Sequence, residues 1–385
     1  MRPAEMATAE AASLPATTET MPAQDGPWHR ATPFLAIIVP TLNEEAYIAA
    51  CLQSLIGQWP EQACEILVVD GGSTDRTADI VAGFTARHPM VRLILNPHRI
   101  QSAAMNLGAR QASPRAAVLV RADAHAVYPG DFVRRCVAEL LRTGATSVVV
   151  PMRNHARDGK GLQRAIAAAQ SSKLGNGGSA HRVGTTSGFV EHGHHAAFDR
   201  AFFLSLGGYD ESFTHNEDAE LDHRASLSSG RIWMCADAPV VYFPRTSLGA
   251  LARQYMKHGS GRARTLRKHG LRPRPRQMAP VAALLGCAAG LATAPLVPAA
   301  AAVTLAYPLA CLGWGAVQAM RRGDPWLLAS GPAMMAMHLG WALGFLRTVA
   351  LGQRRPVAVP QLTGLTAAAA HLVERERAST AVSPG

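Results

Sequence analysis

The chain has 385 residues, 48% of them hydrophobic and 17% charged, which is enough apolar material for one large domain or two medium ones. Its formal net charge is +11 and its isoelectric point is about 9.9, so we expect an anionic partner: a phosphate-bearing substrate, a membrane surface or nucleic acid. The six cysteines are scattered without a CxxC pair, which excludes a short secreted disulfide framework and indicates a reducing compartment.

The N-terminal segment, residues 1–32, is rich in Ala, Thr and Pro. It carries acidic residues where a signal peptide would need an uninterrupted apolar run. We therefore expect this segment to be a disordered tail.

From Phe34 onward, short apolar runs alternate with helix-length amphipathic segments. This alternation predicts an α/β domain with a parallel sheet and helices on both faces. Ligands of such sheets bind at the carboxyl ends of the strands. The expected strands are 34–40, 65–70, 91–96 and 116–123, and the expected helices are 44–58, 75–87 and 100–112. The polar strand ends are Pro40-Thr41, Asp70-Gly71-Gly72 and Asp123-Ala124-His125.

Two segments after Pro151 depart from this alternation. Residues 171–195 are polar and rich in glycine, a pattern that predicts a mobile loop of the kind that covers a substrate. Residues 218–227 predict a helix with acidic residues at its N-terminal end, where the helix dipole favours them.

The strongest change in composition lies in the C-terminal third. Residues 253–276 are densely basic, and residues 277–320 contain no charged side chain. About 20 apolar residues cross a bilayer, so the uncharged block predicts two membrane helices joined by a turn at 294–298. A buried Ala-rich helical bundle in a soluble protein is the alternative.

The number of membrane crossings stays open at this point. A third candidate helix, residues 326–351, contains His338 and Arg347. Lys and Arg mark the cytoplasmic side of membrane spans, and a third complete crossing would place Arg354 and Arg355 on the opposite side, so this third segment could instead be interfacial or re-entrant. The expected organisation is a tail (1–32), an α/β domain (33–252), a basic juxtamembrane segment (253–276), a membrane region of two or three helices (277–352) and a C-terminal tail (353–385).

Four motifs between residues 34 and 245 carry a resemblance to a known family. They are IIVPTLNEEAYIAACLQSL, ILVVDGGSTDRTADI, RADAHAVYPGDF and NEDAELDHR, in that order. Their order and approximate spacing resemble those of family 2 inverting glycosyltransferases, which bind nucleotide sugars in a GT-A fold. The later segment YFPRTSLGALARQYMKHGSGRARTL and the apolar tail are more narrowly similar to the succinoglycan-biosynthesis ExoA type. The resemblance implies a Rossmann-like GT-A domain, mostly parallel in its sheet, followed by C-terminal transmembrane helices.

The resemblance places a nucleotide-sugar site at the strand ends. Pro40, Thr41 and Glu44 would line the nucleoside pocket, where a carboxylate accepts hydrogen bonds from both ribose hydroxyls. Asp70 would accept a hydrogen bond from the base N–H of uracil, while the glycines after it let the backbone come close. The alternatives are a helix N-terminal acid for Glu44 and a turn cap for Asp70.

Several further polar residues match regions near the nucleotide. Arg99 and Asn106 lie where the family often has a cation and an amide, and a surface arginine is the alternative for Arg99. Arg262 and Arg264 could clamp the diphosphate or contact anionic lipid head groups. The processive-polymerase signature Gln-x-x-Arg-Trp is missing, because Gln254 is followed by Tyr-Met-Lys-His, and this favours transfer of one sugar at a time.

The triplet Asp123-Ala124-His125 aligns with the family's Asp-x-Asp, whose later carboxylate contacts a divalent metal that bridges the diphosphate. Imidazole is a good ligand for Mn²⁺ and a poorer one for Mg²⁺, so we expect Asp123 and His125 to bind a divalent metal with Mn²⁺ preferred. The alternative is that His125 caps a loop and Asp123 alone contacts metal or ribose.

The motif NEDAEL supplies the expected general base. An inverting transferase needs a base on the sugar face opposite the leaving nucleotide, and the resemblance assigns this role to Asp218. Glu217 would hold the acceptor or orient the helix, and the two neighbouring carboxylates are expected to raise each other's pKa. Both could also be first-turn helix acids.

The cluster EHGHH contains His192, His194 and His195. A histidine cluster without cysteine or a distant acidic partner is weak support for zinc, so we favour acceptor contacts or a structural role. The segment GGSTDRT is not a dinucleotide-binding fingerprint, because it lacks GxGxxG.

Together these features predict a multi-pass inner-membrane glycosyltransferase with a cytoplasmic catalytic domain. It would move one hexose, with glucose expected, from a UDP-sugar to a lipid-linked saccharide in exopolysaccharide assembly. The alternatives are a polyprenyl-phosphate glycosyl synthase of the dolichyl-phosphate-mannose type, an inactive scaffold and a basic nucleic-acid-binding module. A nucleic-acid partner is not expected, because it explains neither the carboxylate motifs nor the uncharged segment.

Overall fold

The computed structural model describes residues 32–157, 160–177 and 186–352. The expected tails 1–32 and 353–385 therefore lie almost entirely outside the described residues. The strands are β1 (Phe34–Thr41), β2 (Cys64–Asp70), β3 (Val91–Leu95), β4 (Ala116–Arg121), β5 (Ser147–Val150), β6 (Met152–Asn154), β7 (Gly188–Val190), β8 (His194–Asp199), β9 (Ile232–Met234) and β10 (Val240–Tyr242). The helices up to residue 227 are α2 (Ile48–Leu55), η2 (Glu61–Ala63), α3 (Thr77–Thr85), α4 (Gln101–Gln111), α5 (Phe132–Thr143), α6 (Gly161–Ser171), α7 (Lys173–Asn176), α9 (Arg200–Ser205) and α10 (Glu217–Leu227).

The main sheet has eight strands in the order β3-β2-β1-β4-β8-β5-β9-β7. Strands β1 to β4 are mutually parallel, and β8 is inserted antiparallel between β4 and β5. Thr41 at the end of β1 pairs with Asp70 at the end of β2, so these two polar strand ends lie at one edge of the sheet. A second, two-stranded sheet pairs β10 with β6.

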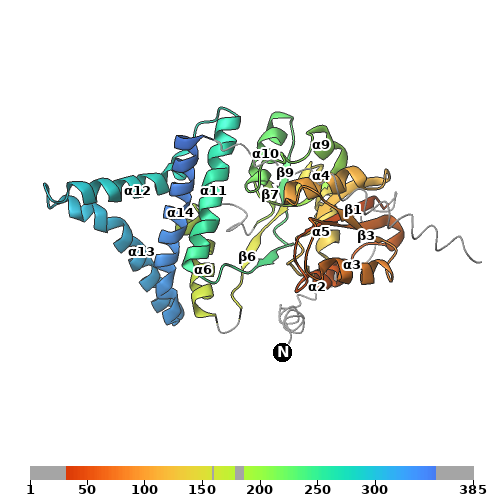
Figure 1. The fold of residues 1–385 in the computed structure, drawn as a ribbon, viewed down its shortest axis with the longest axis horizontal. Helices are drawn as coiled ribbons and strands as arrows, with labels where there is room; N and C mark the ends of the chain where they lie inside the picture. Colours follow the sequence, from red (N-terminus) through yellow and green to blue (C-terminus); the bar gives the residue numbers. More distant parts are fainter. Residues whose placement is uncertain (1–31, 158–159, 178–185, 353–385) are drawn as a thin grey trace, which may run out of the picture.

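Helices cover both faces of this sheet (Figure 1). Successive residues of a strand face opposite ways, and β1 shows this directly. Leu35, Ile37 and Val39 belong to a core with α2, α3 and α5, whereas Ala36 and Ile38 belong to a second core with α4, α9 and α10. The predicted α/β domain with helices on both faces is therefore confirmed.

The sequence predictions for individual elements hold best where local periodicity is strong. All four expected strands before residue 123 and the three helices between them are present, with shifted ends. The expected loop at 171–195 is partly wrong: α7, β7 and the start of β8 form regular structure there, and residues 178–185 lie outside the described residues.

Four long helices follow the sheet: α11 (Leu248–Lys268), α12 (Pro275–Thr293), α13 (Ala300–Arg322) and α14 (Ser330–Leu351), with the short helix η3 (Pro325–Ala329) before the last. The expected hairpin with a turn at 294–298 is present as α12 and α13. The expected domain boundary at residue 252 falls inside α11, which is one continuous helix. In Figure 1, α11 and α14 run side by side next to the α/β domain, and α12 and α13 project away from it.

Glycines allow α11 and α14 to pack backbone against backbone. An added Cβ on Gly344 would lie 2.0 Å from the carbonyl oxygen of Met256, and one on Gly340 would lie 2.5 Å from that of Ala252. Ser260 Oγ donates a hydrogen bond to the carbonyl oxygen of Gly344 at 3.0 Å. Small residues four apart on one helix face permit such close approach. The pair joins the apolar C-terminal helix firmly to α11.

We predict that Gly344→Ala destabilises the protein by about 1–3 kcal/mol, because a methyl group cannot fit against a backbone carbonyl without moving a helix. Thermal unfolding of the purified protein in detergent measures this change. Gly313→Ala in α13 is the matched control, because its Cβ would meet open space and the change improves helix propensity. Equal melting temperatures for the two variants would contradict the close packing.

Candidate active site

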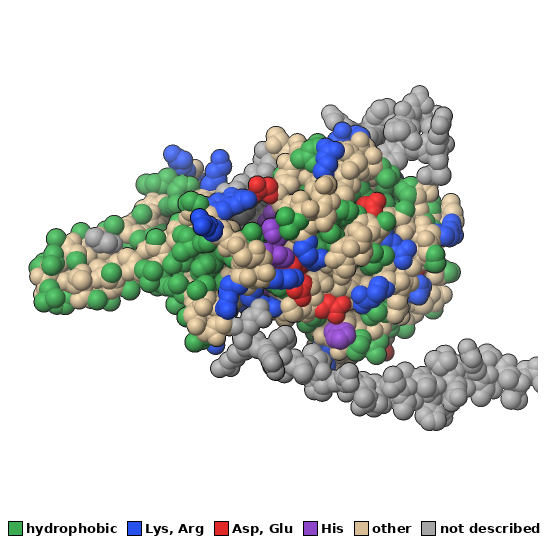
Figure 2. All heavy atoms as spheres, turned by 90° about the horizontal axis from the view of Figure 1, so that it is seen from above, with side chains coloured by type: hydrophobic (Ala, Val, Ile, Leu, Met, Phe, Trp, Pro, Cys, Tyr) green, Lys and Arg blue, Asp and Glu red, His purple; other side chains and the backbone are tan. Residues whose placement is uncertain are grey.

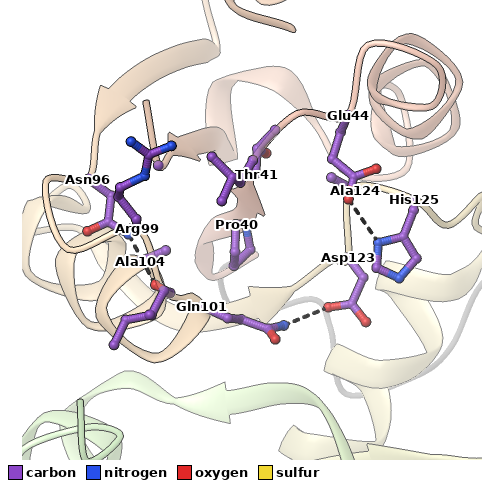
Figure 3. Close-up of a pocket in the computed structure, with 13 residues that line it drawn as sticks. Pro40, Thr41, Glu44, Asn96, Arg99, Gln101, Ala104, Asp123, Ala124 and His125 are labelled. Carbon is purple, nitrogen blue, oxygen red and sulfur yellow. Dashed lines mark hydrogen bonds and ion pairs between the residues drawn. The ribbon is translucent and has the colours of Figure 1, made fainter. Parts of the chain in front are cut away.

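The first four strands end at a single cleft of about 230 Å³ (Figure 3). The ends of β1 and β4 contribute Pro40, Thr41, Glu44, Asp123 and His125. The loop after β2 contributes Gly71, and the segment from β3 into α4 contributes Asn96, Arg99, Ile100, Gln101 and Ala104. The prediction that the polar strand ends converge is thus confirmed.

Asp70 is used differently from the other strand-end residues. It is buried, and its carboxylate accepts hydrogen bonds from the N–H groups of Gly72 and Ser73 and from the hydroxyl of Ser73. Gly71 lines the cleft and Asp70 does not. Gly71 also lies close to the next loop, since an added Cβ would be 3.2 Å from the Cα of Arg99. In this structure Asp70 shapes the loop that forms one wall of the cleft.

Asn106, which the sequence placed near the nucleotide, does not line the cleft, and Gln101 of the same helix α4 does. Asn106 is buried, and its amide bonds the backbone N–H and carbonyl of Tyr209. The Nε2 of Gln101 donates to Oδ1 of Asp123 at 3.0 Å. Residues on one helix face recur every three to four positions, so a shift of five residues separates the buried face from the cleft face.

The Asp123 carboxylate is held ionised. Burial opposes its charge, but Arg121, His194 and His125 lower the pKa of Asp123 to about 2. His194 Nε2 lies 3.5 Å from Oδ2 of Asp123, and burial lowers the pKa of His194 to about 4, so this imidazole is neutral at pH 7. The side chain of Asp123 therefore offers a full negative charge at the edge of the cleft.

Asp123 and His125 bring one carboxylate and one imidazole to the same cleft. His125 is 57% exposed and its Nδ1 lies 3.3 Å from Oε1 of Glu44, a hydrogen bond that raises the pKa of His125 (Figure 3). No group of three or more His, Cys, Asp or Glu side chains in the described residues is arranged to hold a metal. A carboxylate and an imidazole suit Mn²⁺, and the remaining positions would fall to phosphate oxygens or water.

A single buried arginine joins Asp123 to Asp218. Nη1 of Arg121 donates to Oδ1 of Asp218 at 2.8 Å, and its Nε lies 3.3 Å from Oδ1 of Asp123. The Arg121 side chain is only 5% exposed. Tyr209 also donates its hydroxyl hydrogen to Oδ1 of Asp218. The strand-end carboxylate and the helix carboxylate are thus parts of one site.

His195 binds the same helix from the other side. Its Nδ1 lies 3.2 Å from Oδ1 of Asp218, and its Nε2 lies 2.7 Å from Oδ1 of Asp222. His192 reaches the second oxygen of Asp222 at 2.6 Å. Each nitrogen of the buried His195 ring faces a carboxylate, and Nδ1 also lies 2.9 Å from the hydroxyl of Tyr209. Burial opposes the charge of the ring, but Asp222 and Asp218 raise the pKa of His195 to about 10, so the ring is positively charged at pH 7. Figure 2 shows His and acidic side chains gathered in a band across the middle of the molecule, with Lys and Arg on either side.

The two neighbouring acids at the start of α10 titrate in opposite directions. Burial opposes ionisation of Asp218, but Arg121 and His195 hold the pKa of Asp218 well below its usual range. Burial and the charge of Asp218 raise the pKa of Glu217 to about 7. The expectation that the pair raises both pKa values is therefore right for Glu217 and wrong for Asp218, because Asp218 has two cationic partners.

The two candidate arginines of α11 point to different surroundings. Arg264 stacks over the ring of Phe213 and donates to the carbonyl and hydroxyl oxygens of Ser212, so it holds a loop. Arg262 makes no hydrogen bond to the described residues. Burial and the charges of Arg274 and Arg276 lower the pKa of Arg262, and Asp222 opposes this change. Arg262 is therefore a cation beside the network with free donors for an anion.

Sequence reasoning missed Arg121, Gln101, Tyr209 and Asp222. Arg121 carried a weak signal, since a charged residue at the end of an otherwise apolar strand needs a partner. Asp222 carried another, because it follows Asp218 by four residues and so lies on the same helix face. The histidine cluster takes part in the site through His194 and His195, in the structural role favoured over zinc.

Comparisons with known proteins agree with this geometry. Residues 36–207 match the family model described as glycosyl transferase family 2. The chain is 42% identical over 329 residues to the succinoglycan biosynthesis protein ExoA of Rhizobium meliloti (strain 1021), covering 84% of this chain and 96% of that protein. It is 34% identical over 112 residues, 28% of this chain and 34% of the relative, to a Methanococcus voltae dolichyl N-acetyl-alpha-D-glucosaminyl phosphate 3-beta-D-2,3-diacetamido-2,3-dideoxy-beta-D-glucuronosyltransferase.

Among solved structures, the fold is similar to that of the mannosyltransferase PcManGT from Pyrobaculum calidifontis, determined in complex with GDP-Man and Mn²⁺. The TM-score is 0.55 and the sequence identity 21%, covering 87% of this chain and 92% of that one. At this identity the likeness shows the fold, which is of the GT-A type.

We predict that His195→Gln lowers the free energy of unfolding by about 3–5 kcal/mol at pH 6, because it leaves Asp218 and Asp222 buried without their shared cation. Burial opposes the charge of His195, but Asp222 and Asp218 raise its pKa from 6.5 to about 10. Because its pKa is higher in the folded state, protonated His195 stabilises the folded protein fully below pH 6.5. This stabilisation is lost as the pH rises through about 10.

Urea unfolding between pH 6 and pH 10 measures both effects. The parent protein should lose stability across this window, and His195→Gln should show a smaller loss. His98→Gln, at an exposed position, is the control and should match the parent. A parent-like pH dependence in His195→Gln would contradict a charged His195.

Proposed function

The chain belongs to glycosyl transferase family 2, and from that premise we propose that it catalyses inverting transfer of a single hexose from a UDP-sugar to a lipid-linked saccharide. Glucose is the first donor sugar to test. The observation that carries the proposal is the Arg121 guanidinium, which binds Asp123 at the strand-end cleft and Asp218 at the start of α10. The Arg121 guanidinium would thus connect the site of the donor at Asp123 with the site of the acceptor at Asp218.

The cleft is proposed to bind the nucleotide. Pro40, Thr41 and Glu44 would contact the nucleoside, and Arg99 would face the nucleotide from the opposite wall. Asp70 does not line the cleft itself, so a contact with the base would require the base to reach past Gly71 to the one of about four acceptor positions that its three hydrogen bonds leave. This arrangement is the one that the family resemblance implies for a uridine nucleotide.

Asp218 is proposed to act as the general base. All three of its hydrogen bonds reach Oδ1, and none within the described residues reaches Oδ2. The acceptor hydroxyl oxygen would bond to the anomeric carbon as the bond from that carbon to the diphosphate breaks. The hydroxyl proton would pass to Oδ2 of Asp218, and the nucleoside diphosphate would leave with the bonding electron pair. Glu217, whose pKa is raised to about 7, would hold the acceptor by donating a hydrogen bond in its protonated form.

Arg262 is proposed to contact a diphosphate, on either the donor or the lipid carrier. This assignment is supported by its free donors and by the neighbouring Arg274 and Arg276. Arg264 is not included, since its guanidinium is bound to Ser212.

A divalent metal held by Asp123 and His125 would neutralise the leaving diphosphate. The Mn²⁺ in the mannosyltransferase complex supports a metal in this fold, and the imidazole donor supports Mn²⁺ over Mg²⁺.

The proposed setting is exopolysaccharide biosynthesis at the cytoplasmic face of the inner membrane. Two findings support it: the similarity to ExoA over most of both chains, and two helices, Ala300–Arg322 and the continuous stretch Pro325–Leu351, that are long and apolar enough to cross a membrane. A polyprenyl-phosphate glycosyl synthase would use the same donor site, and the mass of the lipid product separates the two functions.

We predict that Asp218→Asn lowers the rate of sugar transfer roughly 100- to 10,000-fold, the usual contribution of a general base. Asp123→Ala should mainly raise the donor KM, because it removes a ligand of the diphosphate metal. The measurement uses membranes that contain the protein, a panel of labelled nucleotide sugars, lipid extract and Mn²⁺ or Mg²⁺.

Asp79→Asn is the matched control, since Asp79 is an exposed acid in the first turn of α3 and should leave the rate unchanged. Transfer at the parent rate by both Asp218→Asn and Asp123→Ala would contradict the site assignments. Absence of transfer from every nucleotide sugar by the parent would contradict the function.

We also predict that a chelator abolishes transfer and that Mn²⁺ restores it better than Mg²⁺. His125→Asp should bring the Mg²⁺-supported rate several-fold closer to the Mn²⁺-supported rate, because Mg²⁺ prefers oxygen ligands. Titration of each metal into the chelated parent, His125→Asp and His98→Gln measures the preference. An unchanged ratio in His125→Asp would exclude His125 as a ligand.

A further inference from the structure

The two candidate membrane helices have different surroundings. Of the most apolar window in Ala300–Arg322, 12% is buried inside the protein, whereas the corresponding figure for Pro325–Leu351 is 33%. Length and composition cannot separate a membrane span from an internal helix. The packing of α14 against the rest of the protein can distinguish these two cases.

One side of α14 is covered by the catalytic domain. Leu251 and Tyr255 of α11 and Ile166 of α6 share an apolar cluster with Met334 and Met337 of α14. Polar contacts extend along the whole helix. They are the Arg164–Asp324 ion pair at 2.8 Å before its start, the bond between His338 Nε2 and the carbonyl of Leu174, and the bond from Arg267 to the carbonyl of Thr348 near its end.

These contacts exclude a bilayer around α14. A bilayer is continuous, so a spanning α14 would carry α11 and the adjoining part of the α/β domain to the same depth (Figure 1). α11 contributes Arg253, Lys257, Arg264 and Lys268, and Lys268 is ion-paired to Asp210 and Glu220 of the catalytic domain. Charged groups in hydrocarbon are strongly unfavourable. α14 therefore lies outside the hydrocarbon core.

The α12–α13 hairpin has the opposite character. Leu284 is the last α12 residue, and Tyr307 the first α13 residue, that packs in an apolar cluster with α14. The residues between them are free of charge, and Leu285, Leu291 and Leu305 are more than half exposed. The free part of α12, nine residues at about 1.5 Å each, is roughly 14 Å long and so reaches about half the thickness of a hydrocarbon core of about 30 Å.

The tip of the hairpin is suited to hydrocarbon rather than to water. Leu296 is 85% exposed and Val297 is 54% exposed. The N–H groups of both donate to the carbonyl of Thr293, and that of Ala300 donates to Val297. Pro295 and Pro298 have no N–H to satisfy. In a membrane, polar backbone groups must be satisfied internally, and the N–H groups of Leu296, Val297 and Ala300 meet that condition.

The base of the hairpin is basic on both arms. Arg272, Arg274 and Arg276 precede or begin α12, and Arg321 and Arg322 end α13, all of them exposed. Such a ring of cations complements the anionic head groups of one leaflet. Figure 2 shows the projecting hairpin free of acidic and basic side chains, with Lys and Arg where it joins the body.

We propose that the α12–α13 hairpin enters one leaflet of an anionic membrane and returns to the same face, with α14 lying along the surface. The protein is then held on a single face of the membrane and crosses it nowhere within the described residues. This replaces the multi-pass arrangement expected from the sequence, and it rests on the proposed membrane attachment but not on the identity of donor or acceptor.

Thiol labelling of the full chain tests this arrangement. Leu296→Cys, Ser228→Cys on the exposed end of α10 and a cysteine added after residue 385 are treated with a membrane-impermeant maleimide in spheroplasts and in inverted inner-membrane vesicles. The parent gives the background from its own cysteines. We expect Ser228→Cys and the C-terminal cysteine to react only in inverted vesicles, and Leu296→Cys to react at least tenfold less in either preparation until detergent is added.

Each alternative gives a different pattern. Reaction of Leu296→Cys in spheroplasts would show a crossing hairpin, and its reaction in untreated inverted vesicles would show a hairpin in the cytosol. Reaction of the C-terminal cysteine in spheroplasts would show that α14 crosses. Any of these overturns the proposal. Labelling needs no catalysis, so a failed transfer assay leaves this test intact, whereas release of the parent from membranes by carbonate would contradict the membrane attachment itself.

Discussion

The buried guanidinium of Arg121 is the constraint on which the site depends. Two carboxylates at this depth would repel each other and lose their hydration, and either would protonate if left alone. Arg121 lies between them at the end of β4 and bonds both Asp123 and Asp218. The chain must therefore bring the start of α10 to the edge of the parallel sheet. The cation keeps both acids charged and fixes the distance between the donor cleft and the proposed base.

The charge balance of the site implies that the proposed diphosphate would need further cations. Three acids, Asp123, Asp218 and Asp222, are ionised, while Arg121 and His195 supply two positive charges. An anionic donor would approach an already negative site. A divalent metal at Asp123 would reverse that sign, and Arg99 in the wall of the cleft adds positive charge. The raised pKa of Glu217 reduces the chance of a fourth buried negative charge near neutral pH.

The sequence predicted the strands and the position of the cleft, which depend on local patterns. It did not predict the side-chain partners that depend on pairing between distant segments. Apolar periodicity located the parallel strands, and their polar ends located the cleft, because both are properties of single segments. Arg121 and His195 were missed as partners because β8 is inserted antiparallel beside β4, a pairing of segments about 80 residues apart that no local pattern reveals. Asn106 was misplaced for a related reason: its helix phase depends on which face of α4 meets the sheet.

α14 shows why hydropathy alone assigns membrane helices poorly. Hydropathy measures composition, whereas lipid exposure depends on what covers the helix. One side of α11 covers α14. The opposite side of α11 carries Gly261, which is in close contact with His215 and Asn216, immediately before Glu217 and Asp218. One helix thus joins the surface-lying element to the segment that carries the proposed base. A membrane that fixes α14 also fixes α11, and through it the height of Asp218 above the lipid surface. If the acceptor is lipid-linked as proposed, its carrier remains in the bilayer and the base must be held at a constant height, which rigid helix packing would provide.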